Sequence, residues 1–221
     1  MEEKVLAWHF AKSERKLNYG DGREIIVGET HEVEGEIKLC SRGLHASINV
    51  LDALSYAPGL ILYRVELSGT VLHGDDKLCA SHRKYLAQID ATDIVLKFAR
   101  DCAKDVLHLW NAPEVVVQFL ETGDVSLARA ASDAARAAAD AARAAYAAGA
   151  AGAAAWAAGA AAWAAYAAAD AARAEDAAGA EDAAADAAAR AARAAYAASK
   201  KAEYNRKLTE IVMNEVTIYS Y

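Results

Sequence analysis

The densest group of chemically capable side chains lies between Cys40 and Ser47. Arg42 offers the planar set of N–H donors that suits a phosphate, and Gly43 permits a tight turn beside it. His45 comes just before a predicted helix, whose first free backbone N–H groups favour an anion. The segment therefore predicts a phosphate or nucleotide site. The alternative is a strand-to-helix turn with a structural histidine.

Three further positions extend this candidate site. His9 stands beside Trp8 on the first predicted strand, and it could face the same cleft as His45. Lys77 ends a polar loop that begins at His73, and Arg83 adds a further phosphate-binding side chain. Each has a plainer interpretation. His9 could be a half-buried strand histidine, Lys77 could belong to a loop in which Asp76 caps a helix, and Arg83 could be a surface charge. No ligand spacing typical of a metal site is present, so we expect none.

The three cysteines are an odd number and have no CxxC spacing. A disulfide framework is therefore not expected, and a reducing cytoplasm fits this usage. Nucleophilic chemistry at Cys40 is one interpretation. The other is that Cys40, Cys79 and Cys102 are small core residues.

The amino-terminal part of the chain predicts strands with few helices. Apolar runs bounded by glycine and polar turn residues are typical of short strands. Ser47 is the expected cap of a helix that ends near Tyr56, because Ile48, Leu51 and Leu54 share one face. The predicted strands cover residues 5–10, 24–27, 60–67, 70–73 and 85–89.

From Thr92 the apolar residues follow a helical period. An amphipathic stripe predicts a first helix that ends near Trp110. Pro113 suits the first position of a second helix that continues to Glu121. Gly123 and the following aspartate are then expected to end that helix and cap the next.

The rest of the chain is rich in alanine, with no Leu, Ile, Val, Met or Phe between Leu127 and Leu208. Alanine has the highest helix propensity, so this region predicts helices. We expect two or three antiparallel helices, with breaks near Gly149/Gly152 and Gly179. A stripe of aromatic residues and glycines, with Trp156 and Trp163 in it, either lines a groove or fills space between helices. The stripe consists of Tyr146, Gly149, Gly152, Trp156, Gly159, Trp163 and Tyr166.

These patterns together predict an α+β fold, in which a small mixed sheet domain precedes an alanine-rich antiparallel helical bundle. The expected domains are residues 1–90 and 91–215. Residues 216–221 alternate like a strand, and we expect them to return to the first domain as an edge strand.

The charge and hydropathy of the chain argue against two classes of partner, nucleic acids and membranes. A net charge of -7 and a pI near 5.4 argue against nucleic-acid binding, which usually needs a basic face. The stretch between Arg143 and Asp170 carries no charge and is long enough to cross a bilayer. It lacks the large aliphatic residues that drive insertion, so a membrane span is not expected.

Residues 5 to 100 resemble an uncharacterised domain family of phage and prophage accessory proteins. The resemblance rests on Trp8-His9-Phe10, on Gly43-Leu44-His45-Ala46-Ser47, and on the run from Ala53 to Gly69. It implies a role in host–phage conflict and carries no established activity.

The same segments are similar to ADP-ribosyltransferase folds. That likeness implies that His9 and His45 flank a nicotinamide-nucleotide cleft, with Tyr56 in the helix that ends in Tyr-Ala and NAD or a related nucleotide as ligand. His45 stands where a tyrosine is usual. The later strand offers only Gln88 where a catalytic glutamate belongs, so a nucleotide could be bound without being turned over.

The alanine-rich helices look like helical domains of immunity proteins. From all of this we expect a phage-type accessory protein that binds a nucleotide-like ligand or a host protein through its first domain. The candidate ligand-binding residues are His9, Arg42, His45, Tyr56, Lys77 and Arg83. An ADP-ribosyltransferase-like enzyme that uses NAD, and a structural protein whose helices form homo-oligomers, are the alternatives.

Overall fold

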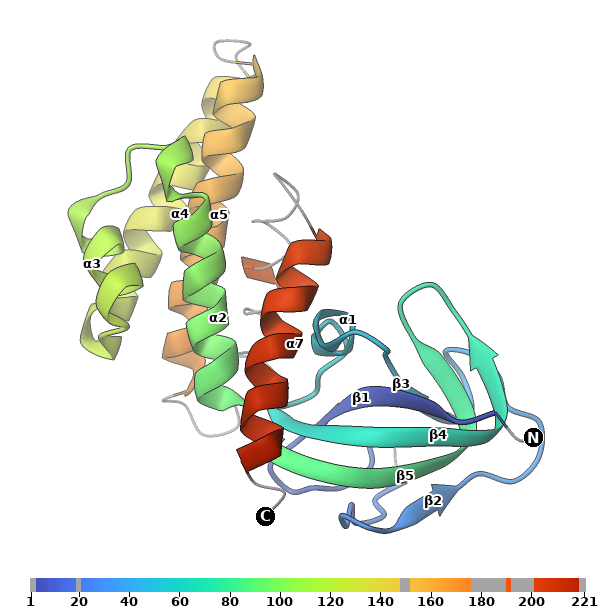
Figure 1. Ribbon diagram of the computed structural model, residues 1–221. Helices are drawn as coiled ribbons and strands as arrows, with labels where there is room; N and C mark the ends of the chain where they lie inside the picture. The colour runs from blue at the N-terminus through green and yellow to red at the C-terminus, as the bar shows by residue number, and fades with distance from the viewer. Residues whose placement is uncertain (1–2, 19–20, 148–151, 176–189, 192–200, 219–221) are drawn as a thin grey trace. The chain divides into compact units, whose positions relative to one another are not determined.

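The computed structural model describes residues 3–18, 21–147, 152–175, 190–191 and 201–218. It has an α+β fold, with an amino-terminal antiparallel sheet followed by helices (Figure 1). The chain divides into two compact units. We call Met1–Thr92 with Asn205–Tyr221 the sheet unit, and Asp93–Tyr204 the helical unit.

The sheet has five strands in the order β1-β4-β5-β2, with β3 also paired to β5. Two long strands form its centre, and three shorter strands pair along them (Figure 1). The strands are β1 (Val5–Ala11), β2 (Thr30–Glu32), β3 (Leu44–Ala46), β4 (Ile61–His73) and β5 (Leu78–Asp90).

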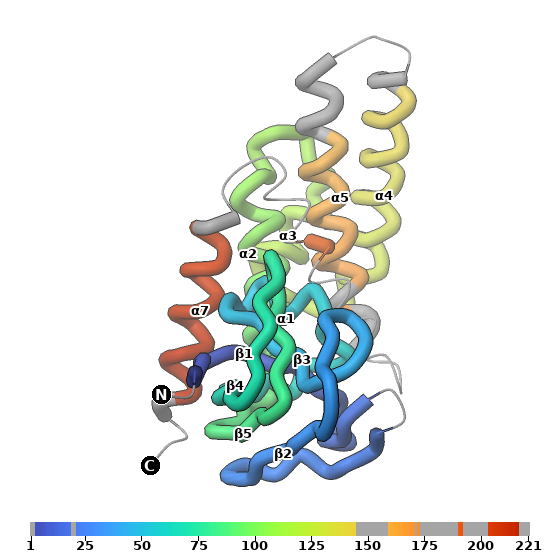
Figure 2. The backbone as a smooth tube through the Cα atoms, turned by 90° about the vertical axis from the view of Figure 1, so that its right-hand side faces the viewer, coloured from blue at the N-terminus to red at the C-terminus, as the bar shows by residue number. Residues whose placement is uncertain are grey.

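The pairings close on themselves, because β3 also meets β1. Trp8 and Ser47 exchange two backbone hydrogen bonds, with N···O distances of 2.8 and 3.0 Å. Strands β1, β4, β5 and β3 therefore form a ring of paired neighbours, which the end-on view of the sheet unit shows (Figure 2).

The inner face of this ring carries the core of the sheet unit. Small and large side chains alternate there, with Ala7 opposite Val65 and Ala11 opposite Ile61 in the β1–β4 register. Tyr63 and Tyr85 pack edge to face within the same cluster, with ring centroids 5.4 Å apart. The short helix α1 (Val50–Leu54) is buried along its length.

Two predicted strands are longer than expected. The sequence predicts a turn at Ser68-Gly69, but β4 continues to His73. Gly69 has a φ of +73° and lies where the register to β5 shifts, so it marks a bulge rather than a turn. The strand predicted at residues 85–89 begins at Leu78 instead.

Three local predictions for this unit were wrong. Residues 24–27 are not a ladder strand, because Ile25 donates its N–H to the Arg15 carbonyl in a loop. Ser47 does not cap α1, since its backbone is paired with Trp8. No helix starts at Asp76, which lies in the tight connection between β4 and β5.

The carboxyl-terminal strand is a further correction. Residues 216–218 belong to helix α7 (Lys201–Ile218), while residues 219–221 lie outside the described residues. Leu208 and Val212 are fully buried and stand four residues apart, as on one face of a helix. The helical period of the preceding residues thus overrides the strand preference of Val-Thr-Ile.

The helical unit begins with α2 (Thr92–Asp105), which buries Phe98 and Cys102 at helical spacing. The predicted continuation to Trp110 is a separate 3-10 turn, η1 (Leu107–Leu109). Helix α3 (Glu114–Thr122) ends as predicted at Gly123, whose φ is +71°. Pro113 caps α3 from just outside it, rather than occupying its first position.

The alanine-rich chain forms α4 (Val125–Ala147) and α5 (Gly152–Glu175), which lie side by side (Figures 1 and 2). The N–H of Ser126 donates to the Asp124 carboxylate at 2.9 Å, as predicted for a cap. The two helices approach closely, because a Cβ on Gly159 would lie 3.5 Å from the Ala142 methyl group. Of the residues at the expected breaks, Gly152 is the first residue of α5, while Gly149 and Gly179 lie outside the described residues.

Candidate functional site: a buried arginine cluster and a surface turn

Strand β5 places two polar side chains on the inner face of the sheet. Arg83 and Tyr85 are two residues apart and pair with Leu67 and Val65 of β4, so both point into the ring. Arg83 is 2% exposed and Tyr85 is fully buried. A buried guanidinium is costly unless its donors are satisfied, so its partners define the site.

Four hydrogen bonds hold the Arg83 guanidinium. Its Nε and Nη2 donate to the Tyr85 hydroxyl at 3.0 and 2.7 Å. Its Nη1 donates to the His45 carbonyl at 2.5 Å and to His9 Nδ1 at 3.2 Å. Two further strands, β1 and β3, thus meet one side chain of β5, and none of these acceptors is a carboxylate.

The hydrogen bonds continue in one direction from Arg83. Tyr85 accepts from the guanidinium and lies 3.1 Å from His31 Nδ1, and His31 Nε2 lies 3.0 Å from the Glu24 carbonyl. A carbonyl can only accept, so Nε2 carries the proton and Nδ1 accepts from the Tyr85 hydroxyl. Neutral His31 therefore completes this series of hydrogen bonds. A second ring proton, on Nδ1, would compete with the Arg83 donors for the Tyr85 hydroxyl oxygen.

Electrostatics agree with neutral histidines here. Burial lowers the pKa of His9 well below 6.5, and the charge of Arg83 lowers it further. Burial also lowers the pKa of His31, with Arg23 as the next cause. We call Arg83, Tyr85, His9 and His31 the arginine cluster.

One inner hydroxyl stands beside this cluster without a hydrogen bond. Within the described part of the chain, the Tyr63 hydroxyl is buried and has no hydrogen-bond partner. Burial raises the pKa of Tyr63 to about 12, so the phenol stays neutral.

A second group of polar side chains lies on the surface, around a tight turn. Lys38 and Arg42 close this turn with backbone N···O distances of 2.7 and 2.9 Å. Cys40 is exposed within it and has a φ of +63°, which is uncommon for a residue other than glycine. Its N–H donates to His45 Nε2 at 3.1 Å, which fixes the His45 ring against the turn.

Lys77 approaches the same turn from the connection between β4 and β5. Its ammonium lies 4.1 Å from the centre of the Tyr56 ring, a cation–π contact. The Tyr56 hydroxyl donates to Asp76 at 2.6 Å, which holds the ring in place. A hydrogen bond with Tyr56 raises the pKa of Lys77, and the Cys40 thiol also lies within hydrogen-bonding reach of the ammonium.

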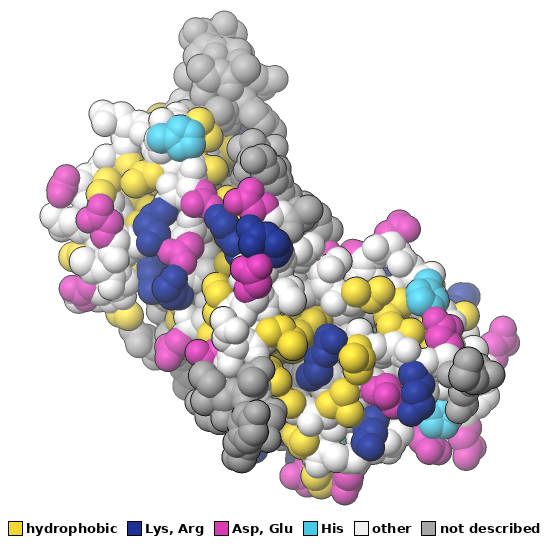
Figure 3. Space-filling model, in the orientation of Figure 1, with side chains coloured by type: hydrophobic (Ala, Val, Ile, Leu, Met, Phe, Trp, Pro, Cys, Tyr) yellow, Lys and Arg dark blue, Asp and Glu magenta, His cyan; other side chains and the backbone are white. Residues whose placement is uncertain are grey.

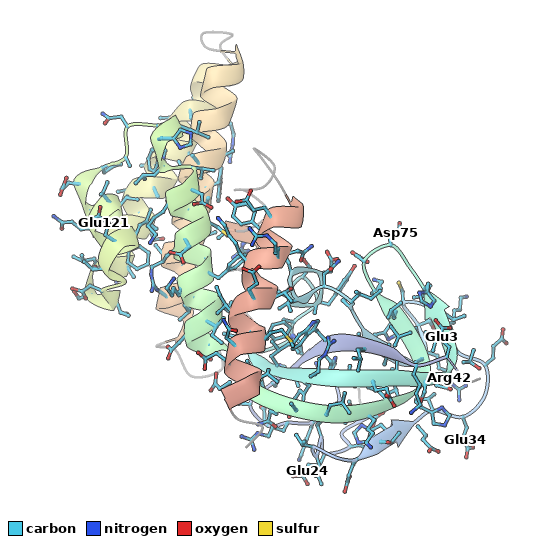
Figure 4. The ribbon with its side chains drawn as sticks, viewed as in Figure 1. Glu3, Glu24, Glu34, Arg42, Asp75 and Glu121 are labelled. Atoms are coloured by element: carbon cyan, nitrogen blue, oxygen red, sulfur yellow. The ribbon has the colours of Figure 1, made fainter. Side chains whose placement is uncertain are left out.

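Arg42 lies on the outside of the turn. Its side chain is exposed and its Nη2 donates to the Glu34 carbonyl at 2.7 Å. Figure 4 shows Arg42 near Glu34 at the end of the sheet and Asp75 at the tip of the β4–β5 hairpin. We call Cys40, Arg42, His45, Tyr56 and Lys77 the turn cluster.

The six candidate residues thus fall into two groups. His9 and Arg83 meet inside the sheet, while Tyr56, Lys77 and Arg42 lie on the surface. His45 belongs to both, since its carbonyl holds Arg83 and its ring holds the Cys40 turn. The space between the two histidines is occupied by the Arg83 side chain rather than by an open cleft.

Sequence reasoning missed Tyr85, His31 and Tyr63. A signal exists for Tyr85, because its two-residue spacing from Arg83 puts both on one face of a strand. His31 has no such signal, since it stands in a polar segment between glycines.

Two negative findings concern the described residues. They contain no group of three or more His, Cys, Asp or Glu side chains that could hold a metal ion. They also contain no helix long and apolar enough to cross a membrane.

The aromatic stripe of the helical unit is described in part. The Trp163 and Tyr166 rings meet edge to face with centroids 5.1 Å apart, and Arg143 of α4 lies 5.4 Å from the Trp163 ring centre. The side chains of Tyr146 and Trp156 lie outside the described residues. In the described part, the Trp163 ring of α5 therefore contacts a side chain of α4.

Comparison with known proteins gives one match. Residues 14–97 match a family model described as "Domain of unknown function (DUF7666)". This segment contains all of the turn cluster and most of the arginine cluster. Comparisons with curated proteins and with solved structures gave no match.

Proposed function

We propose that the sheet unit is a binding module for a phosphate-bearing, nucleotide-like ligand, held on the surface at the turn cluster. The supporting observation is the Lys77 ammonium, which is fixed over the Tyr56 ring with no ion pair among the described residues. Asp76 accepts a hydrogen bond from Tyr56, and the Lys77 side chain is partly exposed. A phosphate group is a suitable partner for a cation in this position.

Neighbouring donors suit the same ligand. Arg42 uses one of its nitrogen atoms on the Glu34 carbonyl and is otherwise exposed. Burial lowers the pKa of His45, and the charges of Arg83 and Lys77 lower it further. The neutral His45 ring can therefore keep accepting the Cys40 N–H, which holds the turn in place beside the ligand. In this proposal the arginine cluster is a rigid support and does not touch the ligand.

Isothermal titration calorimetry with ADP-ribose, NAD, a cyclic nucleotide and inorganic pyrophosphate tests the proposal. We expect heat with at least one of these probes and a loss of affinity of about tenfold or more in Lys77→Ala. Lys84→Ala is the matched control, because Lys84 is exposed on β5 and should bind as the parent does. No heat with any probe, or equal affinity in the two variants, would contradict the proposal.

A host protein is the second candidate partner, and a specific observation favours it. The sheet unit exposes large apolar side chains, and Figure 3 shows hydrophobic patches interspersed with lysine and arginine on its visible face. Such surface is typical of protein contacts. The exposed apolar residues of this unit are Leu6, Ile26, Val27, Ile48, Tyr56, Leu86 and Met213.

The biological setting belongs to the same proposal. The resemblance to phage accessory domains supports a role in host–phage conflict, and free cysteines support a cytoplasmic location. A pull-down from host lysate with the parent chain and with Ile48→Asp separates the two partner classes. Loss of a specific host protein in the variant, with nucleotide binding intact, would favour the protein partner.

A further inference from the structure

The turn that carries Cys40 lies directly over a second thiol. Cys79 is fully buried on β5, and its Sγ lies 3.3 Å from the Arg42 carbonyl and 4.0 Å from the Lys38 carbonyl. Those two residues are the ends of the turn, and Cys40 is in its middle. The Cys79 sulfur therefore lies beneath the residue that exposes the Cys40 thiol.

The local backbone holds these two parts together. Gly43 has a φ of +129°, and a Cβ there would overlap the Cys79 sulfur. Only glycine allows the chain to pass this close to the buried thiol. Cys79 also stands opposite His45 in the β3–β5 register, and His45 Nε2 accepts the Cys40 N–H. One histidine thus ties the turn to the strand that bears Cys79.

The surroundings of Cys40 bring it together with a cation and with solvent. The Lys77 side chain interacts with the Cys40 thiol, and a neighbouring lysine is a general feature of reactive cysteine sites. Cys40 is exposed, so a small oxidant can reach it. Cys102 is buried in α2 of the other unit and provides an internal comparison.

We propose that Cys40 and Cys79 are a peroxide-sensitive dithiol pair, in which Cys40 reacts first and Cys79 resolves it to a disulfide. The Cys40 thiolate attacks one oxygen of hydrogen peroxide, forming an S–O bond while the O–O bond breaks. Hydroxide leaves and takes up the proton that Cys40 released, which gives water and a sulfenic acid.

The second step consumes the sulfenic acid. The Cys79 thiolate attacks the Cys40 sulfur, the S–S bond forms, and the S–O bond breaks. The departing hydroxide combines with the Cys79 proton as a second water. Two thiols are oxidised and one peroxide is reduced to two waters. This inference stands whether or not an anion binds beside Lys77.

The rate of the second step should depend on pH. Burial raises the pKa of Cys79, and the proximity of Cys40 raises it further. Resolution should therefore become faster as the pH rises, because more of Cys79 is then thiolate.

Peptide mapping of the full chain under non-reducing conditions, after treatment with hydrogen peroxide, tests the pair. We expect a Cys40–Cys79 disulfide within one chain, with Cys102 still in its reduced form. In Cys79→Ser, a dimedone adduct should accumulate on Cys40. The proposal is overturned if the parent chain shows only sulfinic acid at Cys40, only disulfides between chains, or no reaction at Cys40.

A second variant separates activation by Lys77 from mere exposure of the thiol. Lys77→Met should slow the peroxide reaction of Cys40 severalfold, while Lys84→Met should leave the rate unchanged. Equal rates in both variants would contradict the assigned role of the Lys77 charge. Both substitutions are on partly exposed or exposed residues, so the fold should persist.

Discussion

The cores of the two units of this chain are built from opposite kinds of side chain. The sheet unit encloses large, chemically specific side chains, with a guanidinium, two phenols and two imidazoles on its inner side. Helices α4 and α5 bury alanine methyl groups, and Ser132 is their polar exception among the described residues. The first core depends on individual hydrogen bonds, and the second depends on how closely two smooth helices approach.

This difference predicts where single substitutions are costly. In the sheet unit the damage should come from unsatisfied polar groups. In the helical unit it should come from added volume. Three substitutions and one change of pH test this contrast, in order of decreasing expected effect.

Replacing the central arginine should have the largest effect. Arg83→Met removes four hydrogen bonds and leaves the buried Tyr85 hydroxyl, and the half-buried His9 ring and His45 carbonyl, without that partner. We expect a loss of about 3 kcal/mol or more in the free energy of unfolding of the sheet unit, measured by urea denaturation. Arg42→Met, on an exposed side chain, should change it by less than about 0.5 kcal/mol. Equal stabilities of these two variants would refute the role of the cluster.

Added volume should be the main hazard in the helical unit. Ala139 of α4 is fully buried, so Ala139→Leu should force its neighbours apart and cost about 1–3 kcal/mol. Ala137→Leu places the same side chain on the exposed face and should be close to neutral. Thermal unfolding followed by circular dichroism measures both. A stabilised Ala139→Leu protein would contradict this, because it would mean that the space around Ala139 can hold a larger side chain.

Acid should weaken the sheet unit selectively. The pKa of His9 and that of His31 are lowered in the folded state, mainly by burial, so the unfolded chain binds these protons more readily. The contribution of these two histidines to the free energy of unfolding is therefore fully present above pH 6.5. It falls as the pH drops below that value, by at most about 1.4 kcal/mol per pH unit for each histidine. His108 is the one histidine of the helical unit and is exposed, so no buried imidazole of that unit adds to this loss. Urea denaturation at pH 7 and 5.5 is the measurement, and a sheet unit equally stable at both would contradict it.

The charged residues on α4 should matter least. Arg143 and Asp140 form an exposed pair at 3.5 Å. Asp140→Asn should change the unfolding free energy by less than about 0.5 kcal/mol, and added salt should not alter the result. A larger loss, seen by thermal unfolding, would mean that surface charge holds the alanine helices together.

The regular features of this fold were predictable from the sequence. The first strand, the helix that begins at Thr92, the stop at Gly123 and the cap at Asp124 all follow from local chemistry. Each depends only on neighbours within one turn or one strand. Such short-range signals are the ones that a single sequence carries.

The arginine cluster was not predictable, because it depends on register between distant strands. Arg83 stands in the polar run Ser81-His82-Arg83-Lys84, which is typical of a surface loop. It becomes buried only when β5 pairs on both edges and the Trp8–Ser47 bridge closes the ring. The residues of the turn cluster were all named from the sequence, but the contact of Lys77 with Tyr56 depends on the hairpin and could not be predicted from it.

Hydrogen–deuterium exchange of Arg83→Met, resolved by peptide and compared with the parent chain, tests the central claim most directly. The claim is that one buried side chain organises the sheet unit by itself. We expect faster exchange throughout β1, β3, β4 and β5, with α4 and α5 unchanged. Parent-like protection in those four strands would contradict it, because the core of the sheet unit would then be stable without the guanidinium.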